Sequence, residues 1–166
     1  MRDFADEVWS YFAYGVYLQE LYLSPDLLGP AAWDIIAEAA QWARSMADVF
    51  VDAHWIGGNP ARDELYGVAA WAPSRGVLFL RNPGNTTQIA GFHPARVLEM
   101  PKNVPLTVRV HCKYASTSQT FSQRIFDKSK DVCGDSSSCI LKTNMRYAVR
   151  LPPLEVMVIV VVPLSD

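Results

Sequence analysis

The sequence predicts an α+β protein, with a helical segment over residues 1–60 and an antiparallel β-sandwich over residues 61–166. Before residue 60 the apolar residues recur at helical spacing and alanine is frequent. After it, short runs of β-type residues alternate with proline and glycine. The length of 166 residues fits one ordinary domain, or one small domain and a piece of another.

Two helices are predicted in the first part. One runs from Asp3 to about Tyr14, and the second from about Ala31 to Ala47, where Gly29-Pro30 sets the start and a wide apolar face follows. Val49–Val51 is then predicted as a short buried strand that leads into a polar, glycine-rich loop. This order of elements is typical of an α/β unit in a parallel sheet.

Six to eight short strands bounded by turn residues are predicted in the second part, and six of them can be placed. Residues 115–138 are rich in serine, threonine, lysine and aspartate, and they are predicted to form a long mobile loop because they offer few apolar anchors. The predicted strands are Tyr66–Trp71, Val77–Leu80, Thr86–Phe92, Leu106–Cys112, Met145–Leu151 and Val156–Val162.

The composition limits the kinds of partner that can be expected. The net charge is −2 and no basic stripe is present, so nucleic acid is not expected. The apolar run Val156–Leu164 is far shorter than the roughly 20 residues of a membrane-spanning helix, and the first residues lack the apolar core of a signal peptide. No membrane partner is therefore expected, and no compartment is assigned.

Half of the residues are apolar, 11% are aromatic and only 19% are charged. This indicates more apolar surface than the chain can cover alone, so we expect a fragment or an obligate partner surface. Trp33, Ile36 and Trp42 on the second helix are the side chains expected to face a missing barrel domain or a second copy of the chain.

Cys133 and Cys139 lie in one short polar loop and either form a disulfide or remain two reduced thiols. The three cysteines have no metal-finger spacing, and no metal site and no cofactor are predicted.

The candidate binding site is Asp52, His54 and Trp55. Trp55 is expected to stack on a sugar while the two polar groups hydrogen-bond its hydroxyls, at the end of a predicted strand where α/β proteins form their ligand crevice. The alternative is a domain junction, in which Trp55 packs and Asp52 caps neighbouring backbone.

No catalytic residue is predicted. A glycosidase needs two carboxyl groups about 5–10 Å apart, and Asp52 has no convincing counterpart. Glu155 begins the last strand and is interpreted as an edge charge that discourages aggregation. His111 and Cys112 are strand neighbours that point to opposite faces, and no nucleophile elbow, phosphate loop or dinucleotide fingerprint is present.

Several segments together resemble the C-terminal part of large glycoside hydrolases of the alpha-galactosidase-like superfamily: Leu18–Pro25, Trp33–Asp34, Ala37–Trp42, Val51–Pro60, Tyr66–Pro83 and Leu151–Val160. The resemblance implies the end of a (β/α)8 barrel followed by a β-sandwich. In that family the nucleophile and acid/base aspartates lie on middle barrel strands, upstream of anything in this sequence.

Two function hypotheses follow. In the first, the chain is the non-catalytic C-terminal portion of a glycoside hydrolase-like protein, which supports the barrel and contributes one wall of a carbohydrate site. In the second, it is an independent β-sandwich module that binds carbohydrate or protein. A third reading, an enzyme acting through Asp52 and His54, has the least support.

Overall fold

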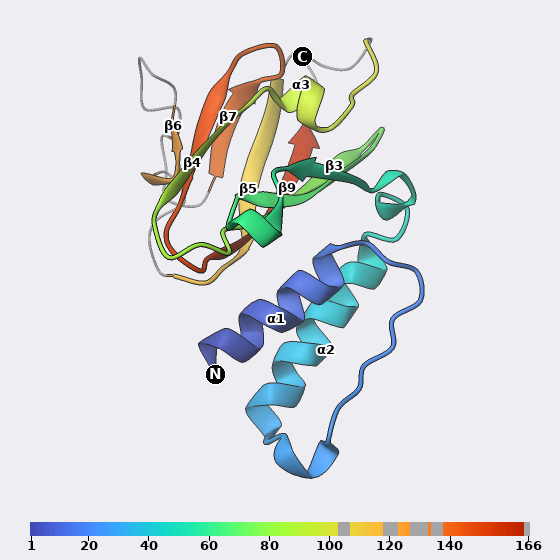
Figure 1. Cartoon of the computed structure of the whole chain (residues 1–166). Helices are drawn as coiled ribbons and strands as arrows, with labels where there is room; N and C mark the ends of the chain where they lie inside the picture. The colour runs from blue at the N-terminus through green and yellow to red at the C-terminus, as the bar shows by residue number, and fades with distance from the viewer. Residues whose placement is uncertain (103–106, 118–122, 127–132, 134–137, 165–166) are drawn as a thin grey trace.

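The structure is a computed structural model that describes residues 1–102, 107–117, 123–126, 133 and 138–164. It is an α+β fold with mixed helices and antiparallel sheets, as the sequence predicts (Figure 1). Within the described residues the helices are α1 (Arg2–Ala13), α2 (Pro30–Ser45) and α3 (Pro94–Val97), and short 3₁₀ turns are η1 (Pro25–Leu27), η2 (Phe50–Asp52) and η3 (Pro60–Arg62).

The described strands form two sheets. The larger has the order β1-β2-β3-β9-β5-β7 and the smaller the order β4-β8-β6, and every pairing is antiparallel. The strands are β1 (His54–Gly57), β2 (Tyr66–Ala72), β3 (Arg75–Arg81), β4 (Gln88–Phe92), β5 (Thr107–Ala115), β6 (Ile125–Phe126), β7 (Ser138–Lys142), β8 (Tyr147–Leu151) and β9 (Val156–Pro163).

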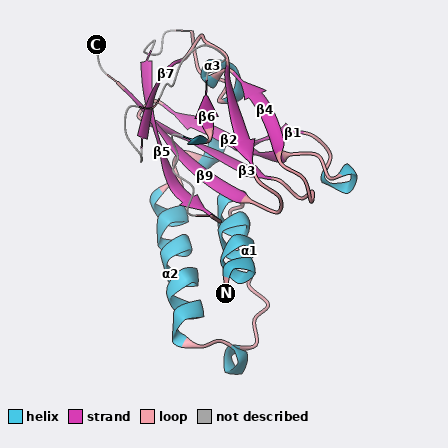
Figure 2. Cartoon of the chain, turned by 90° about the vertical axis from the view of Figure 1, so that its left-hand side faces the viewer, coloured by secondary structure: helices cyan, strands magenta, loops and turns pink. Residues whose placement is uncertain are grey.

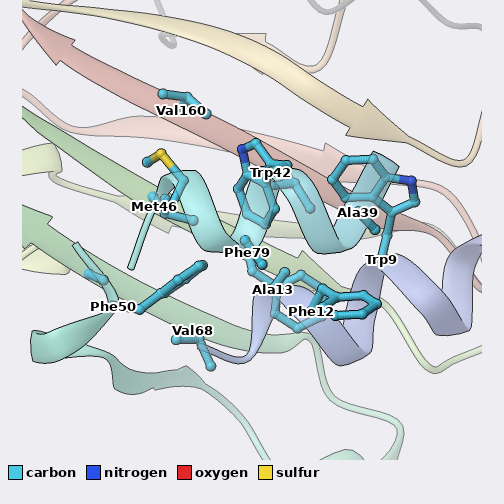
Figure 3. Packing of buried hydrophobic residues seen from close by; sticks show 14 of the residues in the cluster. Trp9, Phe12, Ala13, Ala39, Trp42, Met46, Phe50, Val68, Phe79 and Val160 are labelled. Carbon is cyan, nitrogen blue, oxygen red and sulfur yellow. The ribbon is translucent and has the colours of Figure 1, made fainter. Parts of the chain in front are cut away.

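The first core lies between the two long helices and one face of the six-stranded sheet (Figures 2 and 3). Trp9 of α1 packs against Trp42 of α2, with 5.5 Å between ring centroids, and stacks on Tyr114 of β5 at 5.0 Å. Such aromatic pairs add specific geometry to the burial of large apolar area. The helices are therefore held as a layer on the sheet.

The second core lies between the other face of that sheet and the three-stranded sheet. β9 explains the continuous apolar run near the end of the sequence. Val156, Val158 and Val160 belong to the first core, while Met157 and Ile159 belong to the second. Since successive side chains of a strand point to opposite faces, a strand covered on both faces needs an apolar residue at every position.

Polar contacts also join the helices to the sheet. Tyr114 donates a hydrogen bond to the buried Asp6 of α1 at 2.6 Å. Lys113 pairs with Glu38 of α2 at 2.9 Å. Arg81 at the end of β3 forms an ion pair with Glu7 of α1.

The helices and most strands lie close to their predicted positions, and α2 begins at Pro30 after Gly29 as the sequence indicates. The predicted strand at Val49–Val51 is wrong, because this segment leads into the 3₁₀ turn η2, in which Phe50 is buried and Val51 is exposed. The predicted parallel α/β unit is also wrong, since the following strand, β1, pairs antiparallel with β2. The boundary at residue 60 remains a prediction, although β1 precedes it and belongs to the large sheet.

Two expectations about burial need correction. Ile36 and Trp42 do not face outward: they are 7% and 8% exposed, because the six-stranded sheet covers them. Trp33 is the one of the three that remains exposed, at 42%. Glu155 is not an edge charge, because it precedes a central strand and forms a fully buried ion pair with Arg124.

Much of the predicted mobile loop at 115–138 lies outside the described residues. Within it the structure places the end of β5, the short strand β6 and Cys133, which is joined to Cys139 by a disulfide. The structure thus selects the disulfide from the two alternatives. No helix in the described part of the chain is long and apolar enough to cross a membrane.

Candidate functional site

The predicted site residues lie where η2 passes into β1, the edge strand of the six-stranded sheet. Phe50 anchors η2 in the first core, and β1 then pairs with β2 through four residue pairs. Asp52, His54 and Trp55 are thus within four residues of each other on a short, well-anchored segment.

Trp55 lies on the face of β1 that is turned toward the helices, opposite Val68 of β2 in the strand register. Its indole ring stacks on the phenol ring of Tyr66, with 5.0 Å between the ring centroids and 5° between the planes. Tyr66 is buried, whereas Trp55 is 51% exposed. Trp55 is therefore a flat aromatic surface that rests on a second ring.

His54 lies on the opposite face of β1. Its Nε2 is 2.9 Å from the carbonyl oxygen of Val97, which is the last residue of α3, and its Nδ1 is 3.2 Å from the carbonyl oxygen of Asp52. Each ring nitrogen thus lies within hydrogen-bond distance of a backbone carbonyl oxygen, which accepts from an N–H at that position. In this arrangement His54 ties η2 and β1 to α3.

Asp52 is exposed, and its carboxylate has no hydrogen bond or ion pair within the described residues. The structure therefore does not bring the three predicted residues together into one pocket: His54 and Trp55 point to opposite faces of the strand, and Asp52 lies in solvent. Because Trp55 and Asp52 remain accessible, a binding role for these two stays a prediction, whereas the contacts of His54 are those of a structural residue.

Tyr66, on which Trp55 stacks, is joined by two polar residues that the sequence did not single out, Tyr14 and Arg81. Tyr14, just after α1, donates a hydrogen bond from its hydroxyl to the Tyr66 hydroxyl at 3.2 Å and packs edge-on against Phe79. Arg81 is held next to them by Glu7. These residues come from three distant segments, so no local sequence pattern joins them.

The titratable groups Tyr14 and Arg81 of this cluster are held in fixed protonation states. Burial, together with the hydrogen bond with Tyr66, raises the pKa of Tyr14, so that its hydroxyl keeps its proton at every physiological pH. Hydrogen bonding to Glu7 raises the pKa of Arg81. Neither group is therefore poised to exchange a proton, and the cluster supports the Trp55 ring instead of doing acid–base chemistry.

A second candidate feature is the connector between α1 and α2, residues 14–29. It runs along the outer side of the helices, away from the sheets (Figure 1). Large apolar side chains project from it into solvent, and Trp33 near the start of α2 is also exposed. The exposed connector residues are Val16, Tyr17, Leu18, Leu21, Tyr22 and Leu27.

A cavity of about 110 Å³ lies where the connector passes the end of α2. Val16 and Tyr17 line it on one side, Ala43 and Arg44 on the other, and Phe50 closes it. A second cavity, of about 80 Å³, lies in the second core and is lined by apolar side chains and glycine. It contains no group that would bind or react.

Among the residues that the structure describes, His111 and Cys112 are the remaining candidates for reactive side chains. Burial lowers the pKa of His111 and raises the pKa of Cys112 to about 11, so this thiol stays protonated at neutral pH and is a poor nucleophile. The structure thus agrees with the expectation that the two residues do not act together. No group of three or more potential metal ligands is found among the described residues.

No protein-family model matches the sequence, and no curated protein matches it either. Solved structures do resemble it. A protein from Bacillus halodurans C-125, named a "putative alpha-N-acetylgalactosaminidase", matches over 98% of this chain and 32% of its own, with a TM-score of 0.57 and 12% identity. The present chain therefore spans about a third of the length of that protein.

Two further matches are weaker. The trehalose-6-phosphate hydrolase of Bacillus licheniformis matches over 79% of this chain and 18% of its own, with a TM-score of 0.43 and 8% identity. A GH30 endoxylanase of Clostridium papyrosolvens C71 matches over 78% and 28%, with a TM-score of 0.38 and 11% identity. Each of these three structures is matched over only part of its own length, and the first of them shares the fold of this chain.

Proposed function

We propose that the chain is the non-catalytic C-terminal portion of a glycoside hydrolase-like protein of the alpha-galactosidase-like superfamily. In this proposal α1 and α2 correspond to the end of a (β/α)8 barrel, and the two sheets form the β-sandwich that follows it. The observation that carries the proposal is the match of 98% of this chain to about a third of a solved protein named as a glycosidase.

The carboxylates support a non-catalytic role. Hydrolysis by retaining or inverting glycosidases requires two carboxyl groups facing each other across the scissile bond. The sequence offers no convincing counterpart for Asp52, and three other carboxylates are engaged in contacts within the fold: Asp6 with Tyr114, Glu7 with Arg81, and Glu155 with Arg124.

The apolar surface of the connector supports a missing partner. Six large apolar side chains are exposed within this one connector, and surfaces rich in exposed apolar residues commonly mark interaction sites. In our proposal the connector and Trp33 pack against a barrel domain, while Ile36 and Trp42 hold α2 on the sheet from its other side. Self-association through the same surface is the expected behaviour of the chain alone.

The alternative is an independent carbohydrate- or protein-binding module. The observation that favours it is that the helices complete the first core within the chain itself, through Trp9, Trp42 and the polar contacts to the sheet. A chain with both cores closed folds without a barrel, and its exposed aromatic residues would then serve a ligand directly.

Two measurements distinguish these hypotheses. The purified chain is incubated with a panel of aryl glycosides, including an aryl alpha-N-acetylgalactosaminide because of the name of the similar protein. We expect no turnover above background; turnover that disappears in Asp52→Asn would overthrow the non-catalytic proposal. Sedimentation at several concentrations is expected to show self-association, whereas a monomer that binds no hydrophobic dye favours the independent module.

A further inference from the structure

We infer that the solvent-facing side of the Trp55 ring binds a pyranose sugar. The sugar contacts the ring through the C–H groups on one face of the pyranose. This inference goes beyond the proposed function, because it names a class of ligand and the residue that binds it. It does not depend on whether a barrel domain precedes this chain.

The first argument is the geometry of the ring. Tyr66 covers one face of the Trp55 indole almost in parallel, at 5.0 Å and 5°, and yet Trp55 is 51% exposed. The other face of the indole is thus left toward solvent. An aromatic ring with one face buried against a neighbour and one face free offers a flat surface of fixed orientation.

The second argument is rigidity. Tyr66 is buried, its hydroxyl accepts a hydrogen bond from Tyr14, and Tyr14 packs edge-on against the fully buried Phe79 at 5.3 Å. The Trp55 ring thus rests on a support that continues into the first core. Holding a ring in its bound orientation before the ligand arrives reduces the entropy lost on binding.

The third argument is chemical. The face of an aromatic ring carries a partial negative charge, and it attracts the weakly positive C–H groups that line a pyranose face. Binding sites for neutral ligands combine such apolar surfaces with a few polar groups that fix orientation. The Asp52 carboxylate, three positions before Trp55 in the sequence, is exposed and unpaired within the described residues, and its negative charge disfavours anionic ligands.

Trp33 provides a matched control. It is exposed to a similar degree, at 42%, but it stacks on no other aromatic ring in the described part of the chain. If exposure alone bound sugars, Trp33 and Trp55 would respond alike. The inference requires that added sugar shift the signal of Trp55 and leave the signal of Trp33 unchanged.

The experiment is a titration of the ¹⁵N-labelled full chain with methyl glycosides of galactose, glucose, mannose and N-acetylgalactosamine, followed by the indole N–H signals of the five tryptophans. The Trp55→Ala and Trp33→Ala variants assign two of these signals and serve as test and control. For ligands of this size we expect a dissociation constant on the order of 1 mM for at least one sugar.

A shift of the Trp55 signal that saturates, that is lost in Trp55→Ala and that persists in Trp33→Ala supports the inference. Trp55→Phe keeps a flat ring on Tyr66 and is expected to bind more weakly without losing binding. No shift of Trp55 with any sugar well above that concentration overturns the inference, as does equal binding by Trp55→Ala. Self-association that disappears in Trp55→Ala also overturns it and assigns the ring to an interface.

The failure of this inference is distinguishable from a failure of the proposed function. A chain that binds no sugar and hydrolyses no glycoside contradicts the Trp55 surface and leaves the non-catalytic proposal intact. A chain that hydrolyses glycosides contradicts the proposed function whether or not Trp55 binds.

Discussion

Arg124 and Glu155 form an ion pair whose side chains are 1% and 0% exposed. Arg124 also donates to the hydroxyl of Thr117 at 2.5 Å and to its carbonyl oxygen at 3.1 Å. The pair thus joins the residues before β6 to the start of β9, which lies in the middle of the large sheet. A buried charge without its partner is energetically costly, so the ion pair favours the packing in which Arg124 and Glu155 lie side by side.

Replacing only one member of the Arg124–Glu155 pair is expected to destabilise the fold strongly. Glu155→Gln leaves the Arg124 charge buried without an anion, and we expect the free energy of unfolding to fall by about 3–5 kcal/mol in urea denaturation. Glu38→Gln is the control, because Glu38 forms an exposed ion pair with Lys113 and its loss is expected to cost less than about 1 kcal/mol. Equal effects of the two substitutions would contradict the buried pair.

Asn82 is predicted to be intolerant even of its isostere. It is fully buried, and its amide nitrogen donates to the carbonyl oxygens of Thr86, Leu151 and Pro152 at 2.8, 3.1 and 2.8 Å. Asn82→Asp places acceptors against these acceptors, and we expect a loss of about 3 kcal/mol or more at neutral pH.

The pH dependence of that variant provides its control. Protonation of the carboxyl group introduced by Asn82→Asp restores one donor, so the variant is expected to recover part of its stability relative to the unsubstituted chain as the pH falls. Thermal unfolding at several pH values measures this difference. A loss that does not change with pH would show that the cost is steric and not one of hydrogen bonding.

The Cys112 thiol is predicted to be unreactive in the folded chain. Burial raises its pKa from 9.0 to about 11, so at pH 8 we expect alkylation to be much slower than in the urea-unfolded chain. The folded state favours the protonated thiol. This contribution to stability is therefore complete below pH 9.0 and is lost as the pH rises toward 11. Native labelling as fast as that of the unfolded chain would contradict this environment.

The connector is predicted to govern the association of the chain without contributing to its stability. Leu18 and Tyr22 are exposed, so the double substitution Leu18→Ser with Tyr22→Ser is expected to reduce dye binding and self-association and to leave the unfolding midpoint nearly unchanged. Ile36→Ser is the control, since Ile36 is buried in the first core and its loss should lower the midpoint. Unchanged self-association of the double variant would show that the connector is not part of the interface.

The sequence predicted the elements that depend on local pattern. α2 was expected at about 31–47 and lies at Pro30–Ser45, because its apolar residues recur at helical spacing and proline fits the first turn. The strand at Val49–Val51 was wrong, since an apolar run of three residues fits several backbone conformations. Phe50 buries its ring equally well from a 3₁₀ turn.

That Asp52, His54 and Trp55 form a binding site stays a prediction, and their arrangement could not be read from the sequence. The segment from Asp52 to Trp55 does carry an accessible aromatic ring, as expected. The alternation of a strand places His54 and Trp55 on opposite faces, and this follows only once the segment is known to be the edge strand β1. Tyr14 and Tyr66, which support the ring, are 52 residues apart.

The sequence by itself determined the α+β class, the position of both long helices and the approximate position of most strands, because helix and strand periodicity are properties of neighbouring residues. Tertiary structure alone decided that β9 lies between β3 and β5, that α2 turns Ile36 and Trp42 toward the sheet, and that Glu155 is buried. Each of these depends on a partner distant in sequence. Whether a side chain is exposed or buried, paired or free, is set by that partner and not by the residues beside it.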